Sequence, residues 1–452
     1  METAKSIQRP LFTSKSLLAL LVPLVIERFL DMTVGAADTI MVSAAGEAAV
    51  SGVSLVDNVN NLIVFLLAAL ASGGAVVISQ YLGRDESANA RLAAKQLFYS
   101  TLFASLVLMI PMLLLRKPLL ALLFGKIDAD VMQSAQTYFW ITAFSYPFIA
   151  VYNSLSAVFR SMGNSKVSMI TSLLMNVINL GGNALLVYGF HWGAAGVATA
   201  TLASRIVAAL AVVVLIRNPR NIIFINKLHQ FSYHAGIVKN ILRIGIPSSI
   251  ENGLFHFGRL LVQGVINTMG TTAIAANAVA GKITALTQIP GSAIQLGIIT
   301  VVGFCIGAGD YDQAAYNGKK LILWTYISTT TLCVLVYLLR VPSIAIFRLN
   351  ADVTALATTI LISTMLPIIL IWPLAFPLPN IIRAAGDAKY TMIVSIGSML
   401  LVRFGMSYVL GVLLHMDLLG AWLAMYADWF VRGVAFSVRF ISGKWKTKTV
   451  IT

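Results

Sequence analysis

The sequence predicts an all-α integral membrane protein with about twelve transmembrane helices in two six-helix bundles. Composition is the first reason, because 58% of the 452 residues are hydrophobic and only 11% are charged, whereas soluble proteins have about 25% charged residues. The second reason is an internal repeat, since the second half of the chain follows the first at an offset of about 224 positions. A repeat of this length in so apolar a chain is typical of membrane proteins built from two related lobes.

Short matching motifs define the repeat. The stretch 23–27 reads PLVIE and returns at 247–251 as PSSIE, and 160–166 (RSMGNSK) returns at 383–389 as RAAGDAK. Single residues that match at the same offset are Gly46 with Gly270, Gly83 with Gly307, Lys95 with Lys319, His191 with His415, and Gly196 with Gly420. A nearly constant offset across each half indicates duplication.

About twelve apolar runs are long enough to span a bilayer, which takes about 20 residues of helix. These spans must be helical, because lipid cannot satisfy open backbone groups. The runs are 17–43, 53–80, 95–115, 133–159, 167–190 and 194–216, then 240–267, 274–306, 319–340, 354–382, 390–414 and 419–441. The predicted division is therefore an N-terminal lobe at 1–216, a basic connector at 217–239 and a C-terminal lobe with a basic tail at 240–452. Four prolines at 367, 373, 377 and 379 predict a kinked or broken tenth span.

Lys and Arg in the short loops predict the orientation, because cytoplasmic loops are enriched in them. One side holds Lys5, Arg9, Lys15, Arg84, Arg91, Arg160, Lys166, Arg217, Arg220, Lys227, Lys319, Lys320, Arg383, Lys389 and the tail lysines 444, 446 and 448. On the other side, the loops near 44–52, 190–194, 268–273 and 415–418 have neither residue, and only 116–126 and 340–348 break the bias. Both termini are thus predicted to be cytoplasmic in a multi-pass protein of the cell (inner) membrane. Each half has an even number of spans, so the lobes are related by a pseudo-twofold axis along the membrane normal.

The net charge of +15 does not indicate nucleic-acid binding, because the basic residues lie mostly in short loops between apolar runs. The sequence has no phosphate-binding loop, no soluble domain large enough to hydrolyse a nucleotide, and no catalytic constellation. We therefore expect neither an enzyme nor a bound cofactor, and an ion gradient is the natural driving force.

Three carboxylates inside the first span are the strongest functional candidates, since ionisable groups in lipid are costly. Glu27, Asp31 and Asp38 fall within about 40° on one helix face at 3.6 residues per turn. Such a stripe must face protein or a water-filled cavity, where desolvation disfavours the charged form and favours proton exchange. Oxygen-rich surroundings would equally suit Na⁺, with Asp38 as a candidate ligand. The alternative is that these groups only bond to neighbouring helices.

Polar residues in other spans extend this candidate set. Asn179 and Asn183 are one turn apart in the fifth span, and Thr201 lies in the sixth. Glu27 and Glu251 occupy the same repeat position, so this glutamate is present in both halves. Asp38, in contrast, corresponds to Val262 in the second half. Candidates for further cavity charges are Asp57, Lys282 and Arg259, with an Asp57–Lys282 pair across the lobes as one arrangement. For all of these, packing or interhelical bonding is the alternative.

Taken together, these motifs resemble the multidrug and toxic compound extrusion (MATE) family over nearly the whole chain. The matching stretches are 38–43 (DTIMVS) followed by Gly46, 80–83 (QYLG), 159–164 (FRSMGN), 176–179 (NVIN) with 187–189 (VYG), and 193–201 (GAAGVATAT). The resemblance implies two six-helix bundles facing each other in a V and transport by alternating access. It also implies a monomer that exports organic cations and amphipathic drugs in exchange for H⁺ or Na⁺.

The resemblance further implies an ion site in the N-terminal lobe, which maps onto Asp38, Asn179, Asn183 and Thr201. One branch of the family has Asp where this chain has Asn183, so a charge is missing here that Glu27 and Asp31 could supply. Another branch pairs a span-seven Glu with a span-ten Asp. Glu251 matches the first of these, but span ten has no Asp, and Trp372 stands near that position. Asp38 is therefore our candidate for the central coupling carboxylate.

A flippase for a lipid-linked saccharide or another lipid, from the same wider superfamily, is the alternative function. Such proteins often have a strongly cationic central cavity and extra spans. The acidic stripe of the first span and the count of about twelve spans favour the antiporter.

Overall fold

The structure is a computed structural model that describes residues 10–43, 45–125, 127–226, 228, 230–448 and 450–451. All regular structure in this part of the chain is helical, and eight helices are long and apolar enough to cross a membrane. The predicted all-α membrane fold is confirmed. Of the basic residues that predicted orientation, Lys5, Arg9 and Lys227 lie outside the described residues.

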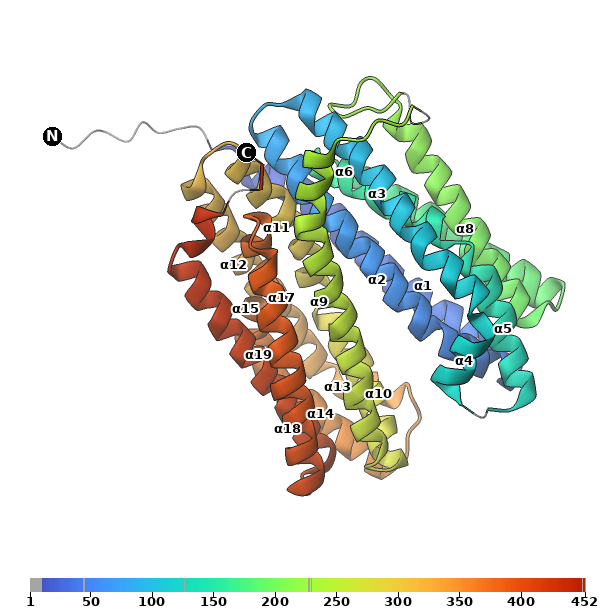
Figure 1. Cartoon of the computed structure of the whole chain (residues 1–452). Coiled ribbons are helices and arrows are strands. Elements are labelled where there is room, and N and C mark those ends of the chain that lie inside the picture. Colours follow the sequence, from blue (N-terminus) through green and yellow to red (C-terminus); the bar gives the residue numbers. More distant parts are fainter. Residues whose placement is uncertain are drawn as a thin grey trace.

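The N-terminal half forms six helical rods around the core of its lobe (Figure 1). They are α1 (Ser14–Ser43), α2 (Glu47–Gly83), α3 (Ser87–Leu114), the pair α5 (Ala129–Ala143) and α6 (Tyr146–Ser161), then α7 (Ser165–Asn183) with its π-helical extension η1 (Ala184–Gly189), and α8 (Gly193–Ile216). The predicted fourth span is thus interrupted, because Phe144 and Ser145 separate α5 from α6 and Pro147 lies in the first turn of α6. The short helix α4 (Arg116–Phe124) occupies one of the two loops that broke the charge bias.

The C-terminal half repeats this arrangement with more interruptions. Its elements are α9 (Ala235–Asn267), α10 (Thr271–Thr287), α11 (Ile289–Gly307), α12 (Tyr311–Leu338), α13 (Arg340–Ala345), α14 (Ala351–Leu370), α15 (Trp372–Ala375), α16 (Pro379–Ala384), α17 (Ala388–Gly397), η2 (Ser398–Phe404), α18 (Gly405–Tyr408), η3 (Val409–Leu413), α19 (Asp417–Ile441) and the 3₁₀ turn η4 (Lys444–Thr447). The proline-rich tenth span is broken into α14, α15 and α16, as predicted. The predicted eighth span is also broken, because α10 ends at Thr287 and α11 begins at Ile289 with Pro290 in its first turn.

Backbone conformation shows the duplication independently of side chains. Gly46 and Gly270 have φ values of 95° and 91°, and His191 and His415, which are not glycines, have 55° and 53°. Positive φ is uncommon for a residue with a Cβ, so its recurrence at one repeat position indicates that the same turn was inherited twice.

Two glycines allow the lobes to touch at one end of the molecule. A Cβ on Gly83 of α2 would lie 2.0 Å from the carbonyl oxygen of Phe304, and a Cβ on Gly307 of α11 would lie 2.0 Å from that of Gln80. The pairs 80–83 and 304–307 correspond in the repeat, so this contact lies across the pseudo-twofold axis. Gln80 also donates to the Ala384 carbonyl at 2.8 Å.

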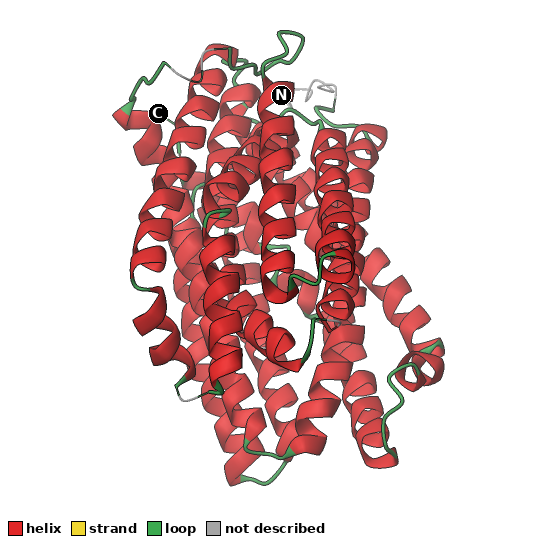
Figure 2. Ribbon diagram, turned by 90° about the vertical axis from the view of Figure 1, so that its right-hand side faces the viewer, coloured by secondary structure: helices red, strands yellow, loops and turns green. Residues whose placement is uncertain are grey.

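The bundles lie close together near the C-terminus and diverge toward the opposite end (Figure 1). Leu11 N–H donates to Gln313 at 2.7 Å, and Lys446 lies 3.4 Å from Asp312, so the first and last described segments meet at the start of α12. Figure 2 shows the rods from the side, with loops mainly at the two ends of the molecule.

Candidate functional site

A cavity of about 580 Å³ lies mainly in the N-terminal lobe, with Leu296, Ile299 and Thr300 of α11 completing its wall, and it holds most of the intramembrane charge of that lobe. The predicted stripe of Glu27, Asp31 and Asp38 on α1 faces this cavity, which confirms that the three share a helix face. Asp57 of α2 is the fourth carboxylate in its wall. Three arginines line it as well: Arg28, Arg160 and Arg205. The site therefore combines acids and bases that are separated by up to 178 positions in the sequence.

Asp38 lies beside the predicted polar residues of α7 and α8. The Asn183 amide donates a hydrogen bond to Oδ1 of Asp38, and Asn179 donates to the Thr201 hydroxyl at 3.3 Å. Asp38, Asn179 and Thr201 line the cavity, whereas Asn183 is fully buried behind them. The structure thus brings the four residues together as two neighbouring bonded pairs.

Asp31 forms a second link between α1 and α7. Its Oδ1 accepts hydrogen bonds from Ser172 at 2.9 Å and from Asn176 at 3.3 Å. Its other oxygen lies 3.8 Å from Arg28 on the same helix. Asp38 also accepts a hydrogen bond from α7, so the two carboxylates connect α1 to α7 at two positions along the helices.

The three arginines of this cavity were not predicted to line it, because mainly acids were considered from the sequence and Arg160 was expected in a loop. Arg205 of α8 donates to Ser145 at 2.6 Å, and Arg28 contacts Asp31 as described above. For Arg28 and Arg205, a lone arginine in each apolar run was the available signal. Asp57, predicted as a cavity charge, accepts from the Tyr138 hydroxyl at 2.8 Å, a partner that no local spacing indicates.

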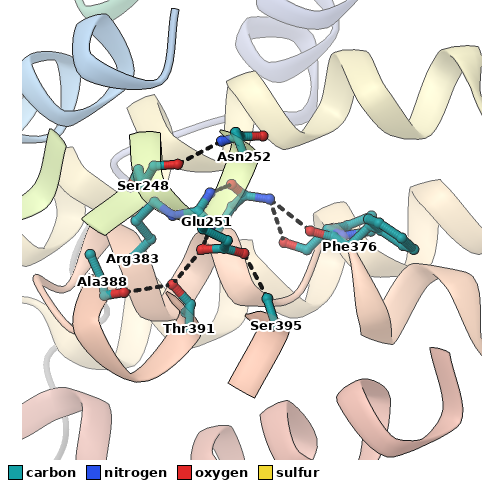
Figure 3. Close-up of polar contacts among 10 residues, drawn as sticks. Ser248, Glu251, Asn252, Phe376, Arg383, Ala388, Thr391 and Ser395 are labelled. Carbon is teal, nitrogen blue, oxygen red and sulfur yellow. Dashed lines mark hydrogen bonds and ion pairs between the residues drawn. The ribbon is translucent and has the colours of Figure 1, made fainter. Parts of the chain in front are cut away.

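The repeated glutamates have opposite surroundings. Glu251 is buried and forms a 2.8 Å ion pair with Arg383 of α16, with hydrogen bonds from Thr391 at 3.1 Å and Ser395 at 2.7 Å on α17 (Figure 3). Glu27 is equally buried and has Arg160, the repeat mate of Arg383, among its charged neighbours. Among the described residues, however, its Oε2 has no hydrogen-bond partner. The carboxylate of Glu251 is therefore fully bonded, whereas, in the described part of the chain, that of Glu27 has an oxygen without a partner.

A second cavity of about 530 Å³ lies in the C-terminal lobe. The predicted cavity charges Arg259 and Lys282 line it, together with Trp372. Asp57 and Lys282 therefore face different cavities, and the structure does not form the cross-lobe pair considered above. Glu251 is not in this wall, because its carboxylate is held by Arg383.

Comparison with known proteins matches nearly the whole chain. The sequence model of the MatE family matches residues 23–185 and again 247–409, two segments related by the repeat offset. An uncharacterized transporter, YisQ, of Bacillus subtilis is 29% identical and covers 98% of this chain and 97% of its own. A probable multidrug resistance protein, NorM, of Thermotoga maritima is 26% identical, with coverages of 97% and 94%. A solved structure described as an outward-facing multidrug resistance MATE transporter of the MOP superfamily has a TM-score of 0.85 at 21% identity and covers 98% of both chains.

Proposed function

The chain belongs to the MatE family of multi-pass membrane transporters, and we propose that it is a monomeric secondary antiporter of the cell membrane. In this proposal it exports organic cations and amphipathic drugs in exchange for H⁺ or Na⁺. The observation that supports this most is the set of four carboxylates facing one cavity of the N-terminal lobe. The multidrug resistance names of relatives such as the Thermotoga protein support the substrate class.

Asp38 is the proposed coupling group. An anionic Asp38 attracts an organic cation entering the cavity, and a proton or Na⁺ that neutralises the carboxylate removes that attraction. The Thr201 hydroxyl and the Asn179 amide provide neutral oxygens in the same wall, which is the ligand type that a hard cation prefers. Substrate and coupling ion thus compete for one charge, as exchange requires.

The links from α1 to α7 give this competition a mechanical consequence. A hydrogen bond to an ionised acceptor is roughly twice as strong as one between neutral groups. Neutralising Asp31 or Asp38 therefore weakens the contacts with Asn176 and Asn183 that hold α1 against α7. α1 contains Pro23, which makes it easier to bend. We propose that this bending favours release of substrate.

The contact between the lobes supports transport by alternating access. The lobes touch through Gly83 and Gly307 at the end that holds the first and last described segments. With both termini on the cytoplasmic side, this arrangement is closed toward the cytoplasm and faces outward. The loop charges and the divergence of the bundles in Figure 1 support this orientation.

Efflux of a fluorescent organic cation from proteoliposomes tests the proposal. We expect transport by the intact protein under one imposed gradient, of pH or of Na⁺, and loss of that transport in Asp38→Asn. Asp130→Asn is the matched control, because Asp130 is exposed and lies outside the cavity. Intact transport by Asp38→Asn would remove Asp38 from the mechanism.

A lipid flippase is the second candidate, and the basic C-terminal cavity is the observation that favours it. In that case deletion of the gene would cause a lipid carrier to accumulate without changing drug resistance. The acidic N-terminal cavity favours the antiporter instead.

A further inference from the structure

The cavity of the C-terminal lobe differs in charge from that of the N-terminal lobe. Its wall contains Arg259 of α9, Lys282 of α10 and Arg403 of η2. Among the described residues, no Asp or Glu lines it. The N-terminal cavity, in contrast, has four carboxylates beside its three arginines. The duplicated lobes have therefore acquired cavities of opposite character.

The three cations have few partners of their own. In the described part of the chain, no hydrogen bond or ion pair engages the side chain of Arg259 or Lys282. The Arg403 guanidinium lies 5.7 Å from the Phe255 ring, and its buried Nε has no hydrogen-bond partner. Asp428 acts on Arg403 electrostatically, but it does not line the cavity and accepts a hydrogen bond from Ser398 instead. Buried polar groups are normally hydrogen-bonded, and the Arg403 Nε is such a buried donor without a partner among the described residues. Arg259 and Lys282 are exposed residues of the cavity wall with charges that are unpaired in the described chain, so this wall has capacity to bind an anion.

Aromatic rings also line this cavity. Trp372 and Phe376 stack with ring centroids 5.5 Å apart, and Phe376 contacts Trp429 edge to face at 6.0 Å. Phe255 lies 5.9 Å from Phe376 and continues this surface toward Arg403. Flat apolar surfaces beside a few fixed charges are typical of sites for amphipathic ligands. The cavity volume of about 530 Å³ is within the range of small-molecule pockets.

We propose that this cavity binds the anionic group of an aromatic amphipath, with Arg259, Lys282 and Arg403 facing the negative charge and the aromatic wall facing the ring system. The inference deepens the proposed function, because it adds a site for anionic or zwitterionic substrates to a cation exporter. The negative group could belong to a soluble organic anion or to the headgroup of an anionic lipid. Arginine suits a planar carboxylate, sulfonate or phosphate, since its donors are arranged as a fork.

A matched pair of probes tests the charge preference. Pyrenesulfonate and pyrenemethylammonium share one ring system, and both accept excitation energy from Trp372, Trp422 and Trp429 around the cavity. Binding is followed as quenching of tryptophan emission by the purified full-length protein in neutral phosphatidylcholine nanodiscs. We expect the sulfonate to bind at least about tenfold more tightly than the ammonium, a difference that corresponds to about 1.4 kcal/mol.

Charge variants assign the preference to the cavity. We expect Lys282→Gln and Arg259→Gln each to weaken sulfonate binding by about tenfold, and Lys282→Arg to retain it. Lys166→Gln is the control, because it removes the same charge from an exposed position outside both cavities. Retention by Lys282→Arg shows that the glutamine variants act through charge and not through misfolding.

Anionic lipid distinguishes the two sources of the ligand. Competition by phosphatidylglycerol in the nanodisc would assign the negative group to a lipid, and unchanged binding would assign it to a soluble anion. Unaltered sulfonate binding in both glutamine variants would overturn the proposal. If the binding proposal fails but the protein still transports organic cations, the proposed function remains intact. If the protein binds the sulfonate but transports nothing, only the proposed function is refuted.

Discussion

Replacing Gly83 by alanine tests how the lobes close against each other. In the structure, the added Cβ would lie 2.0 Å from the Phe304 carbonyl oxygen and 2.8 Å from the Ala308 backbone nitrogen. Both contacts are with backbone, so no side chain can rotate away. The only relief is separation of α2 from α11 at the end where the lobes now touch.

The size of the effect follows from overpacking. An ordinary contact distance of about 3.4 Å would require the helices to move apart by more than about 1 Å, and overpacking of this kind costs about 1–3 kcal/mol. That cost applies only to the arrangement in which the lobes touch at this end. The population of that arrangement, relative to one open at this end, should fall by about 5- to 150-fold. Gly307→Ala should act in the same way, since its Cβ would meet the Gln80 carbonyl oxygen at 2.0 Å.

Cysteine accessibility measures this change. Ser79 is fully buried, and its Cβ lies 3.1 Å from the Cβ position of Gly303 on the opposing helix. Ser79→Cys, in a background with Cys305→Ala and Cys333→Ala, should react slowly with a maleimide and much faster when Gly83→Ala is added. Gly264→Ala is the control, because its Cβ would meet nothing within 4 Å. Equal labelling rates with and without Gly83→Ala, in protein that remains folded, would refute this account of lobe closure.

Three further predictions concern the carboxylates. Glu251→Gln should destabilise the protein by about 3–5 kcal/mol, because it leaves the buried Arg383 without its ion pair; a thermal midpoint in detergent that matches the unmodified protein would contradict this. Glu27→Gln should cost less in the same measurement, since Oε2 of Glu27 has no partner to lose, and a loss as large as that of Glu251→Gln would show that the two motifs are equivalent. Asn183→Asp should strengthen Na⁺-dependent efflux by placing a second carboxylate beside Asp38, which efflux at graded Na⁺ concentrations would show; unchanged Na⁺ dependence would count against a cation site there.

Local periodicity was enough to predict the acidic side of the N-terminal cavity. Glu27, Asp31 and Asp38 share a face because one helix fixes their relative angles, and Asn179 lies one turn from Asn183 for the same reason. The repeat likewise predicted that Gly83 and Gly307 correspond. It did not predict that each faces the other helix, because that contact depends on how the two lobes meet.

The partners of the buried charges could not be predicted from spacing. Tyr138 is 81 positions from Asp57, and Arg383 is 132 positions from Glu251. The repeat contained a hint, since Arg160 and Arg383 recur together with Glu27 and Glu251, but recurrence does not show that two residues touch. Arg259 and Lys282 were predicted as cavity charges, but spacing did not predict that they share one cavity with Arg403, because the three come from separate helical segments.

Proteoliposome efflux with separately imposed gradients measures the proposed antiport itself. We expect a pH gradient or a Na⁺ gradient to drive export of a fluorescent organic cation by the unmodified protein and by Asp130→Asn, and Asp38→Asn to abolish this export. Undiminished gradient-driven export by Asp38→Asn, or no export by the unmodified protein under either gradient, would contradict the proposal.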